Sequence, residues 1–362
     1  VLARALQIAR GLERRAVEYA PGRVHRLETL FARRFADVRE MLARRGLEGH
    51  VRRCHGDLHL ENIVLIAGEP VLFDALEFSE DLATGDVLYD LAFLVMDLVA
   101  HGDVAAARRV LERYLWKVDD FDNYEGLAAF GLFMAMRAGV RAIVAADRAR
   151  VIGHTGKADV AGKIAGYVDL ALSCIETQKP LLVAIGGFSG TGKTVVSRNL
   201  APRLGAVPGA IHLRSDLERK AMFHVDETTR LAPDAYDKST SVRVYDRVFL
   251  KARKTLESGY CVVADAVFST AEERAAIEQV ARVAGAEFAG IWLDVDEAVA
   301  ARRIAARRGD ASDATIAVLE QQRKRGAGDI AWQRLDASST VEEAVDAVVR
   351  YIARHRPQDI RR

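Results

Sequence analysis

The stretch LLVAIGGFSGTGKT, residues 181–194, decides the fold of the second half of the chain. Its first five residues are an apolar run of the kind that forms a strand buried on both faces, and a helical pattern begins at its lysine. Strand, glycine-rich turn and helix in this order predict a loop that binds phosphate groups. The turn matches the pattern G-x-x-x-x-G-K-[ST] at Gly187, Gly192, Lys193 and Thr194.

Each residue type in this loop suits the binding of an oligophosphate. Glycines let backbone N–H groups approach the phosphates, and the helix behind them adds the positive end of its dipole. The amine of Lys193 can reach the β- and γ-phosphates, and the hydroxyl of Thr194 can ligate Mg²⁺. We therefore predict ATP and Mg²⁺ as cofactors. The predicted nucleotide-binding residues are Gly187, Ser189, Gly190, Thr191, Gly192, Lys193 and Thr194.

Two other interpretations of these glycines explain less. A turn that merely joins a strand to a helix is disfavoured, because the strand, loop and helix that the motif requires are all indicated by the sequence. A dinucleotide-binding turn is disfavoured, because G-x-G-x-x-G cannot be placed on these glycines with a helix behind it.

The composition indicates a globular protein of about two domains. The chain has 362 residues and a formal net charge of +1, which gives no reason to expect nucleic acid or a membrane as a partner. Residues 1–53 hold thirteen arginines against six acids, whereas residues 54–100 hold ten acids and no lysine or arginine. Such an acidic block is either a solvated face or a region that attracts a divalent cation or a basic neighbour.

Cysteine usage and hydropathy predict a cytoplasmic protein. Cys54, Cys174 and Cys261 are widely spaced and odd in number, which favours a reducing compartment. No signal peptide is recognised, and the longest apolar stretch, residues 87–100, is interrupted by two aspartates and is too short to span a bilayer. The first residue is valine rather than methionine, which leaves open whether the chain is a fragment.

A short polar junction divides the chain into two predicted domains, residues 1–178 and 179–362. The first domain is predicted to be mostly helical, with a small β-hairpin at residues 63–73 and a helix break at Gly153–Gly156. In the second domain helices and strands alternate, which predicts an α/β fold with a five-stranded parallel sheet and helices on both faces.

Charged residues follow the second and third predicted strands of this sheet. Ligands of open α/β sheets lie at the carboxyl ends of the strands, so Asp216, Arg219 and Asp265 are expected beside the phosphate-binding loop. We expect Asp216 to accept the proton of an attacking hydroxyl, Arg219 to hold an anion, and Asp265 to ligate Mg²⁺ or order the nucleophile. The alternative for Asp216 is a capping role in the first turn of its helix, where Ser215 and Glu218 form a capping box.

An arginine-rich helix follows the fourth predicted strand. It is similar to the lid of nucleotide and small-molecule kinases, whose arginines close over the phosphates at transfer. Arg303 and Arg307 are four residues apart and share a helix face, so both are candidate catalytic residues. The alternative is an ordinary solvated helix.

A second motif, CHGDLHLEN at residues 54–62, lies just before the predicted hairpin of the first domain. His-Gly-Asp, with an asparagine five residues after the aspartate and a further aspartate at the end of the next strand, resembles the catalytic core of the aminoglycoside phosphotransferase and choline kinase family. The resemblance implies that Asp57 is a catalytic base and that Asn62 and Asp74 hold Mg²⁺ on the ATP phosphates.

The resemblance also implies that Asp86 and Asp90 support this catalytic loop, whereas His55 has a structural role. Members of that family carry an amino lobe with a phosphate-contacting lysine on a strand, and the residues before His55 show no such strand. Two interpretations stay open: a phosphotransferase that is truncated in this chain, or a remnant retained as a helical scaffold.

Residues 180–355 resemble P-loop kinases of small metabolites, nucleosides or polynucleotide ends, and the two halves together resemble a bacterial bifunctional type. The resemblance implies that the second domain transfers the γ-phosphoryl group of ATP to a hydroxyl of a small molecule. A nucleotide-dependent switch without an acceptor remains an alternative. Polynucleotide-end kinase activity is a further alternative, which the lack of a basic excess in residues 180–362 disfavours. The sequence specifies neither the acceptor nor the oligomeric state.

Overall fold

The computed structural model describes residues 1–152 and 157–355 and divides into two compact units. The predicted helix break at Gly153–Gly156 lies outside the described residues. The first unit is made of residues 1–111, 126–177 and 206–208, and the second of residues 112–125, 178–205 and 209–362. The end of one helix and the start of the next, residues 112–125, therefore group with the second unit.

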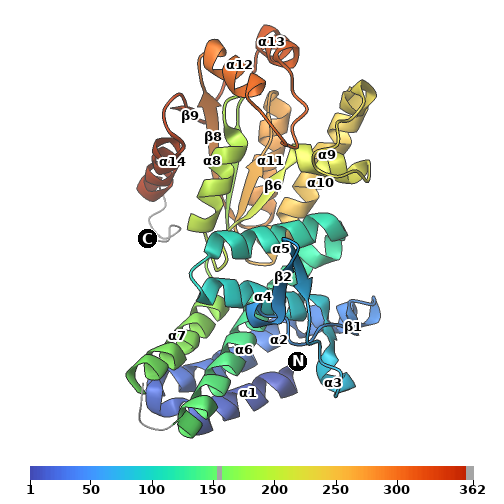
Figure 1. The fold of residues 1–362 in the computed structure, drawn as a ribbon. Helices are drawn as coiled ribbons and strands as arrows, with labels where there is room; N and C mark the ends of the chain where they lie inside the picture. Colours follow the sequence, from blue (N-terminus) through green and yellow to red (C-terminus); the bar gives the residue numbers. More distant parts are fainter. Residues whose placement is uncertain (153–156, 356–362) are drawn as a thin grey trace. The chain divides into compact units, whose positions relative to one another are not determined.

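Helices make up most of the first unit (Figure 1). α2 packs against α1 and α7, and its Leu27, Phe31 and Val38 are buried along one face. The helices are α1 (Leu2–Arg15), α2 (Pro21–Leu47), α3 (Glu80–Ala83), α4 (Val87–Ala100), α5 (Val104–Val118), α6 (Phe121–Ile152) and α7 (Lys157–Ile175), with 3₁₀ turns at Val17–Tyr19 and Leu60–Asn62.

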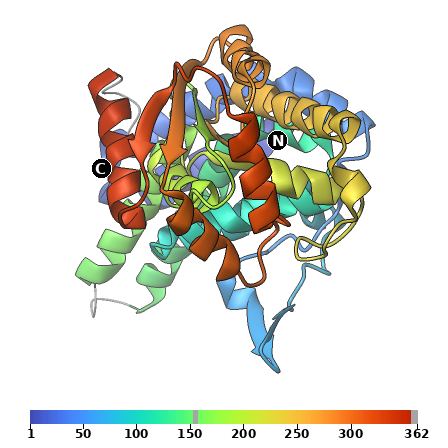
Figure 2. The same ribbon diagram turned by 90° about the horizontal axis from the view of Figure 1, so that it is seen from above.

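Two antiparallel strand pairs accompany these helices. β1 (Val51–Arg53) pairs with β4 (Thr84–Asp86), and β2 (Ile63–Ile66) pairs with β3 (Glu69–Leu72). The second pair is the hairpin expected from the sequence, and Figure 2 shows it, in light blue, projecting from its unit. The mostly helical fold with a small hairpin is thus confirmed.

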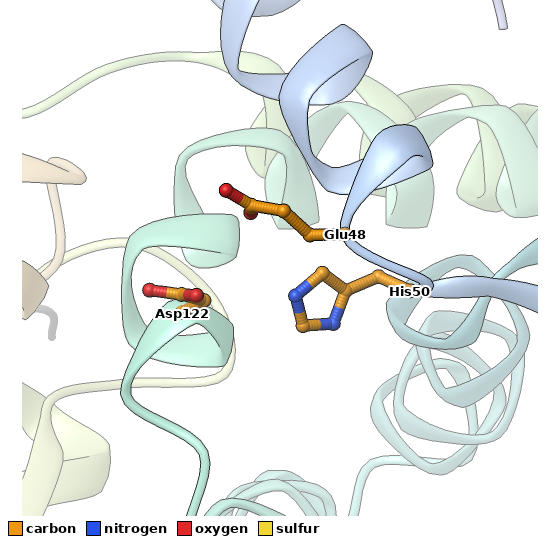
Figure 3. A group of neighbouring side chains, drawn as sticks. All are labelled: Glu48, His50 and Asp122. Atoms are coloured by element: carbon orange, nitrogen blue, oxygen red, sulfur yellow. The ribbon is translucent and has the colours of Figure 1, made fainter.

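The turn between α2 and β1 is held by the backbone of a buried histidine. His50 donates its N–H to the carbonyl oxygen of Arg45 at 3.1 Å, and its own carbonyl accepts the N–H of Val87 at 3.0 Å. Figure 3 draws the side chains of Glu48 and His50 at this turn, together with Asp122, which belongs to the second unit. His50 therefore joins α2 to the start of α4.

The long helix α6 is apolar and mostly buried. Residues 121–150 are long and apolar enough to cross a membrane by length and composition, but 78% of the apolar window is buried inside the protein. A buried apolar helix of this kind is what the core of a helical domain requires. The helix therefore gives no reason to expect a membrane span.

The second unit is built on a five-stranded sheet in the order β6-β7-β5-β8-β9, with every neighbouring pair parallel. The strands are β5 (Leu181–Gly186), β6 (Ile211–Arg214), β7 (Val262–Asp265), β8 (Glu287–Asp294) and β9 (Gln333–Asp336). The helices are α8 (Lys193–Leu200), α9 (Ser215–Met222), α10 (Lys238–Glu257), α11 (Ala271–Val283), α12 (Glu297–Ala305), α13 (Ile316–Arg325) and α14 (Val341–His355), with 3₁₀ turns at Ala201–Arg203 and Pro233–Tyr236.

Helices cover both faces of this sheet, as the alternating pattern predicted. α8 packs with α14 on one face, and α10 packs with α11 on the other (Figure 1). Every residue of the central strand β5 is buried, which explains its unbroken apolar sequence. Because parallel strands all end at one edge, the residues after β5, β6, β7 and β8 meet there.

Candidate active site

The loop between β5 and α8, residues 186–194, approaches neighbouring backbone too closely for side chains at two of its glycines. A Cβ on Gly187 would lie 2.6 Å from the carbonyl oxygen of Leu293, and one on Gly190 would lie 2.6 Å from that of Ala300. Both glycines also have positive φ, 140° and 85°. The tight turn, called the phosphate loop below, therefore depends on glycine for its shape.

Three predicted residues meet at the base of this loop. Thr194 donates its hydroxyl to Oδ2 of Asp265 at 2.6 Å, and Lys193 Nζ donates to the carbonyl oxygen of Phe188 at 2.9 Å. Thr194 lies in the first turn of α8, which follows β5, and Asp265 ends β7, so adjacent strands bring the two together. A hydroxyl and a carboxylate are hard oxygen ligands, and this pair fits a partly hydrated Mg²⁺.

The charges around Asp265 keep it ionised. Burial by itself would raise its pKa, but His212, Arg214 and Lys193 outweigh this effect and hold the pKa at about 2. Burial lowers the pKa of Lys193, and the charge of Arg307 acts in the same direction. A carboxylate that stays charged at every physiological pH suits a metal ligand.

Asp216 has the opposite electrostatic character. It lies in the first turn of α9, and burial raises its pKa in spite of the nearby positive charges of Arg214 and Lys193. The negative charge of Asp265 also raises the pKa of Asp216. Two carboxylates beside one loop, one with a raised and one with a lowered pKa, are what a proton acceptor and a metal ligand require.

Two residues at this edge of the sheet were not selected by sequence reasoning. His212 and Arg214 are buried on β6, and Arg214 lies directly opposite Asp265 in the register of the sheet. Arg214 donates to Asp310 at 3.0 Å, with its Nε 3.9 Å from Asp265. The sequence did offer a signal for both residues, because they are among the last residues of a predicted strand that ends beside the phosphate loop.

The expectation that the two candidate lid arginines share a helix face is wrong, because α12 ends at Ala305 and only Arg303 lies on it. Arg303 donates to the carbonyl oxygens of Thr191 and Ala337 at 3.3 and 2.9 Å, so it braces the phosphate loop against the end of β9. Arg307 lies 3.8 Å from Asp310, and its buried Nη1 has no hydrogen-bond partner among the described residues. Arg307 therefore has a donor available for a phosphate group.

Arg219 lies on α9 and is buried against the segment between α9 and α10. It donates to the carbonyl oxygen of Ala235 at 2.6 Å and to the hydroxyl of Ser241 at 3.4 Å, and its guanidinium lies 4.7 Å from the ring centroid of Tyr236. These contacts organise the α9–α10 segment, residues 223–237. Arg219 therefore shapes the wall beside Asp216 and is already engaged by protein groups.

The loop after α12 is tied to this same wall. Asp313 accepts hydrogen bonds from Lys220 at 2.6 Å, from the hydroxyl of Tyr236 at 2.5 Å and from the N–H of Leu231 at 3.1 Å. Lys220 is only 1% exposed, and inside the protein its ammonium group is paired with this carboxylate and with the carbonyl oxygen of Thr229. The loop that carries Asp310 and Asp313, residues 306–315, is called the lid loop below.

In the first unit, the structure brings Asp57 and Asn62 together. The amide of Asn62 donates to Oδ2 of Asp57 at 3.0 Å, and the ring of His59 lies 3.2 Å from the same oxygen. Asp90 accepts the N–H groups of His55 and Gly56 at 3.1 and 2.9 Å, which is the supporting role expected of it.

The other candidate Mg²⁺ ligand of this unit, Asp74, lies at the same end of the hairpin. Phe73 donates its N–H to the carbonyl oxygen of Asn62 at 3.2 Å, so Asp74 follows the residue that faces Asn62. Asp74 is exposed, with a φ of 59°, a conformation that is uncommon outside glycine. Asp86 was expected to support the catalytic loop. Its carboxylate binds Arg45, with oxygen–nitrogen distances of 2.7 and 2.9 Å.

Two known families match different parts of the chain. Residues 2–130 match the phosphotransferase enzyme family, and residues 182–327 match an AAA domain. The chain thus combines an aminoglycoside phosphotransferase-like part with a P-loop kinase-like part, as the two motifs predicted.

Among curated proteins, the chain is similar to proteins of Mycobacterium bovis and Mycobacterium tuberculosis that are described as uncharacterized. Each is 31% identical over 313 residues, which cover 86% of this chain. The chain spans 61% of the length of these relatives.

Solved structures of small-molecule kinases also align with about half of the chain. A gluconokinase from Sinorhizobium meliloti is 19% identical with a TM-score of 0.35, over 49% of this chain and 94% of that one. The APS kinase of Mycobacterium tuberculosis, in complex with AMPPNP and APS, is 18% identical with a TM-score of 0.34, over 48% of this chain and 98% of that one.

Proposed function

We propose that the second unit is a kinase that transfers the γ-phosphoryl group of MgATP to a hydroxyl of a small molecule. The observation that carries the proposal is the meeting of Lys193, the Thr194–Asp265 pair and Asp216 around one phosphate loop. A phosphate-binding loop, a metal-ligand pair and a carboxylate with a raised pKa are the parts that phosphoryl transfer to an alcohol requires.

Each residue then has a separate task. Backbone N–H groups of the phosphate loop and Lys193 bind the phosphates, and Thr194 with Asp265 would hold Mg²⁺, which neutralises charge on the phosphate oxygens. The acceptor oxygen gives its proton to Asp216 and forms a bond to the γ-phosphorus. The bond from that phosphorus to the β,γ-bridging oxygen breaks, and ADP leaves. Arg307 is placed to stabilise the transferring group.

The acceptor belongs beside Asp216, where α9 and the α9–α10 segment form the wall. We propose a small molecule, with no nucleic acid and no membrane as partner, and a cytoplasmic location, which the three free cysteines favour. Asp57, with Asn62 and Asp74 as Mg²⁺ ligands, is proposed as a second phosphotransfer site of the same chemistry in the first unit.

The test is ADP release in the presence of a panel of sugars, amino sugars, nucleosides and antibiotics. We expect MgATP consumption that rises with one class of acceptor and falls at least about a hundredfold in Lys193→Ala. Calorimetry that shows no binding of MgATP to the wild-type protein would remove the basis of the proposal.

A nucleotide-dependent switch is the second candidate, and the ion pairs of the lid loop favour it. Arg214 with Asp310, and Lys220 with Asp313, hold this loop to the rest of the unit. If the protein is a switch, ATP hydrolysis will be independent of any acceptor and will survive Asp216→Asn. A kinase loses its acceptor-dependent reaction in the same variant.

A further inference from the structure

A side chain from far upstream in the sequence accepts a backbone hydrogen bond from the edge strand of the sheet. β6 pairs with β7 on one side and is the first strand in the order of the sheet. Glu112, from the last turns of α5, accepts the backbone N–H of His212 through Oε1 at 2.7 Å. A carboxylate that caps a strand N–H fixes the strand at that residue.

The side chain of the same histidine points at the candidate metal ligand. His212 is 8% exposed, and its Nε2 lies 3.4 Å from Oδ2 of Asp265. This buried nitrogen has no hydrogen-bond partner among the described residues. The oxygen that it approaches is the one that also accepts the hydroxyl of Thr194 at 2.6 Å.

Glu112 is itself held firmly within the second unit. Its segment, residues 112–125, donates the indole N–H of Trp116 to the carbonyl oxygen of Leu217 at 2.9 Å. Asp119 of the same segment accepts from Lys251, which is fully buried, at 2.9 Å. The segment therefore contacts both β6 and α9, the two elements that carry His212 and Asp216.

We propose that His212 is a positioning residue that orients Asp265 toward the bound metal, and that Glu112 fixes His212 in place. The inference rests on the proposed function, since it concerns the same Mg²⁺ site. An Nε2–H directed at Oδ2, 3.4 Å away, would hold that oxygen and leave the second oxygen of Asp265 for the metal or its water. Ligands of a metal are commonly held by such outer partners, whose loss costs about 10- to 100-fold in metal affinity.

The experiment measures the Mg²⁺ concentration that the full chain needs for tight ADP binding. A fluorescent ADP analogue reports the binding. His212→Leu removes the donor, whereas His212→Gln keeps an N–H near the position of Nε2. We expect His212→Leu to need at least about tenfold more Mg²⁺ than the wild type, and His212→Gln to need less than about threefold more. Affinity for the analogue without Mg²⁺ should be the same in all three proteins.

The pair Glu112→Leu and Glu112→Gln gives an independent comparison, because glutamine retains an oxygen that accepts the N–H of His212. We expect Glu112→Leu to shift the Mg²⁺ requirement in the same direction, and Glu112→Gln to leave it near the wild-type value. This comparison also decides the question if His212→Leu does not fold.

Two results would overturn the inference while leaving the proposed kinase intact. In the first, His212→Leu and Glu112→Leu keep the wild-type Mg²⁺ requirement. In the second, they weaken binding of the analogue equally with and without Mg²⁺, which a merely structural role would produce. Wild-type binding that does not respond to Mg²⁺ would instead contradict the metal site of the proposed function, and this inference with it.

Discussion

Thr194 and Asp265, 71 residues apart in the sequence, share a hydrogen bond of 2.6 Å between Oγ1 and Oδ2. Thr194 lies in the first turn of the helix behind the phosphate loop, and Asp265 ends the adjacent strand. Their contact brings the candidate Mg²⁺ ligands to the loop that would hold the phosphates.

Replacing Asp265 tests this contact directly. Asp265→Asn removes the negative charge but keeps the size of the side chain, so we expect the Mg²⁺ requirement for ADP binding to rise at least about tenfold. Titration of Mg²⁺ against a fluorescent ADP analogue measures the change. Asp329→Asn, at an exposed carboxylate, is the matched control and should bind as the wild type does. An unchanged requirement in Asp265→Asn would show that Asp265 does not serve the metal.

The lowered pKa of Asp265 also predicts a contribution to acid stability. Its pKa is about 2 in the folded protein against an ordinary 3.8, so the charged carboxylate stabilises the fold above pH 3.8. This contribution, about 2 kcal/mol, is lost as the pH falls through 3.8 toward 2. Urea unfolding of the second unit should therefore show a weaker loss of stability over this range in Asp265→Asn than in the wild type. Equal losses in both proteins would contradict the lowered pKa.

The raised pKa of Asp216 predicts the acid limb of the pH–rate profile. A general base acts when deprotonated, so acceptor-dependent ADP release should rise with pH and have its midpoint above 3.8, the ordinary value. Asp216→Asn should lower the rate about 100- to 10,000-fold and abolish this limb. Asp246→Asn, at an exposed carboxylate of α10, should change neither. A rate that is unaffected by Asp216→Asn excludes Asp216 as the base.

The glycines of the phosphate loop predict a position-dependent effect of alanine. At Gly190 the new Cβ would lie 2.6 Å from the carbonyl oxygen of Ala300 and φ is 85°, so Gly190→Ala should cost about 1–3 kcal/mol and impair nucleotide binding. Gly162→Ala is the control, since nothing lies within 4 Å of a Cβ there and the residue is helical. It should be neutral or stabilising by up to about 1 kcal/mol. Thermal unfolding and MgATP calorimetry compare the two.

The contacts of Asp313 predict that the lid loop keeps the α9–α10 segment ordered. Asp313→Asn weakens the charged bond to Lys220 and the bond from Tyr236, so residues 223–237 should open more often. Arg230 is an exposed tryptic site in this segment, and we expect its cleavage to become about tenfold faster. Glu320→Gln, at an exposed residue of α13, should leave the cleavage rate unchanged. Equal rates in all three proteins would show that Asp313 does not restrain the segment.

Local patterns were sufficient to predict much of the second unit. The strand before the phosphate loop, the loop itself and the helix behind it are adjacent in the sequence, so their order and residue types carry the information. Asp216 and Asp265 could be placed at the same edge because both follow apolar strands, and parallel strands end together. The hairpin beside Asp57 was predictable for the same local reason.

The tertiary structure alone decided which partner each charged side chain has. Arg303 looked like Arg307 from helix spacing, but only the fold shows it bound to the backbone of the phosphate loop. The contact between His212 and Glu112 depends on the strand order and on the grouping of residues 112–125 with the second unit. Amphipathic periods and turn residues act over a few neighbouring positions, so the sequence determined the elements. Contacts across strands depend on how distant elements pack, and no short stretch of sequence specifies that packing.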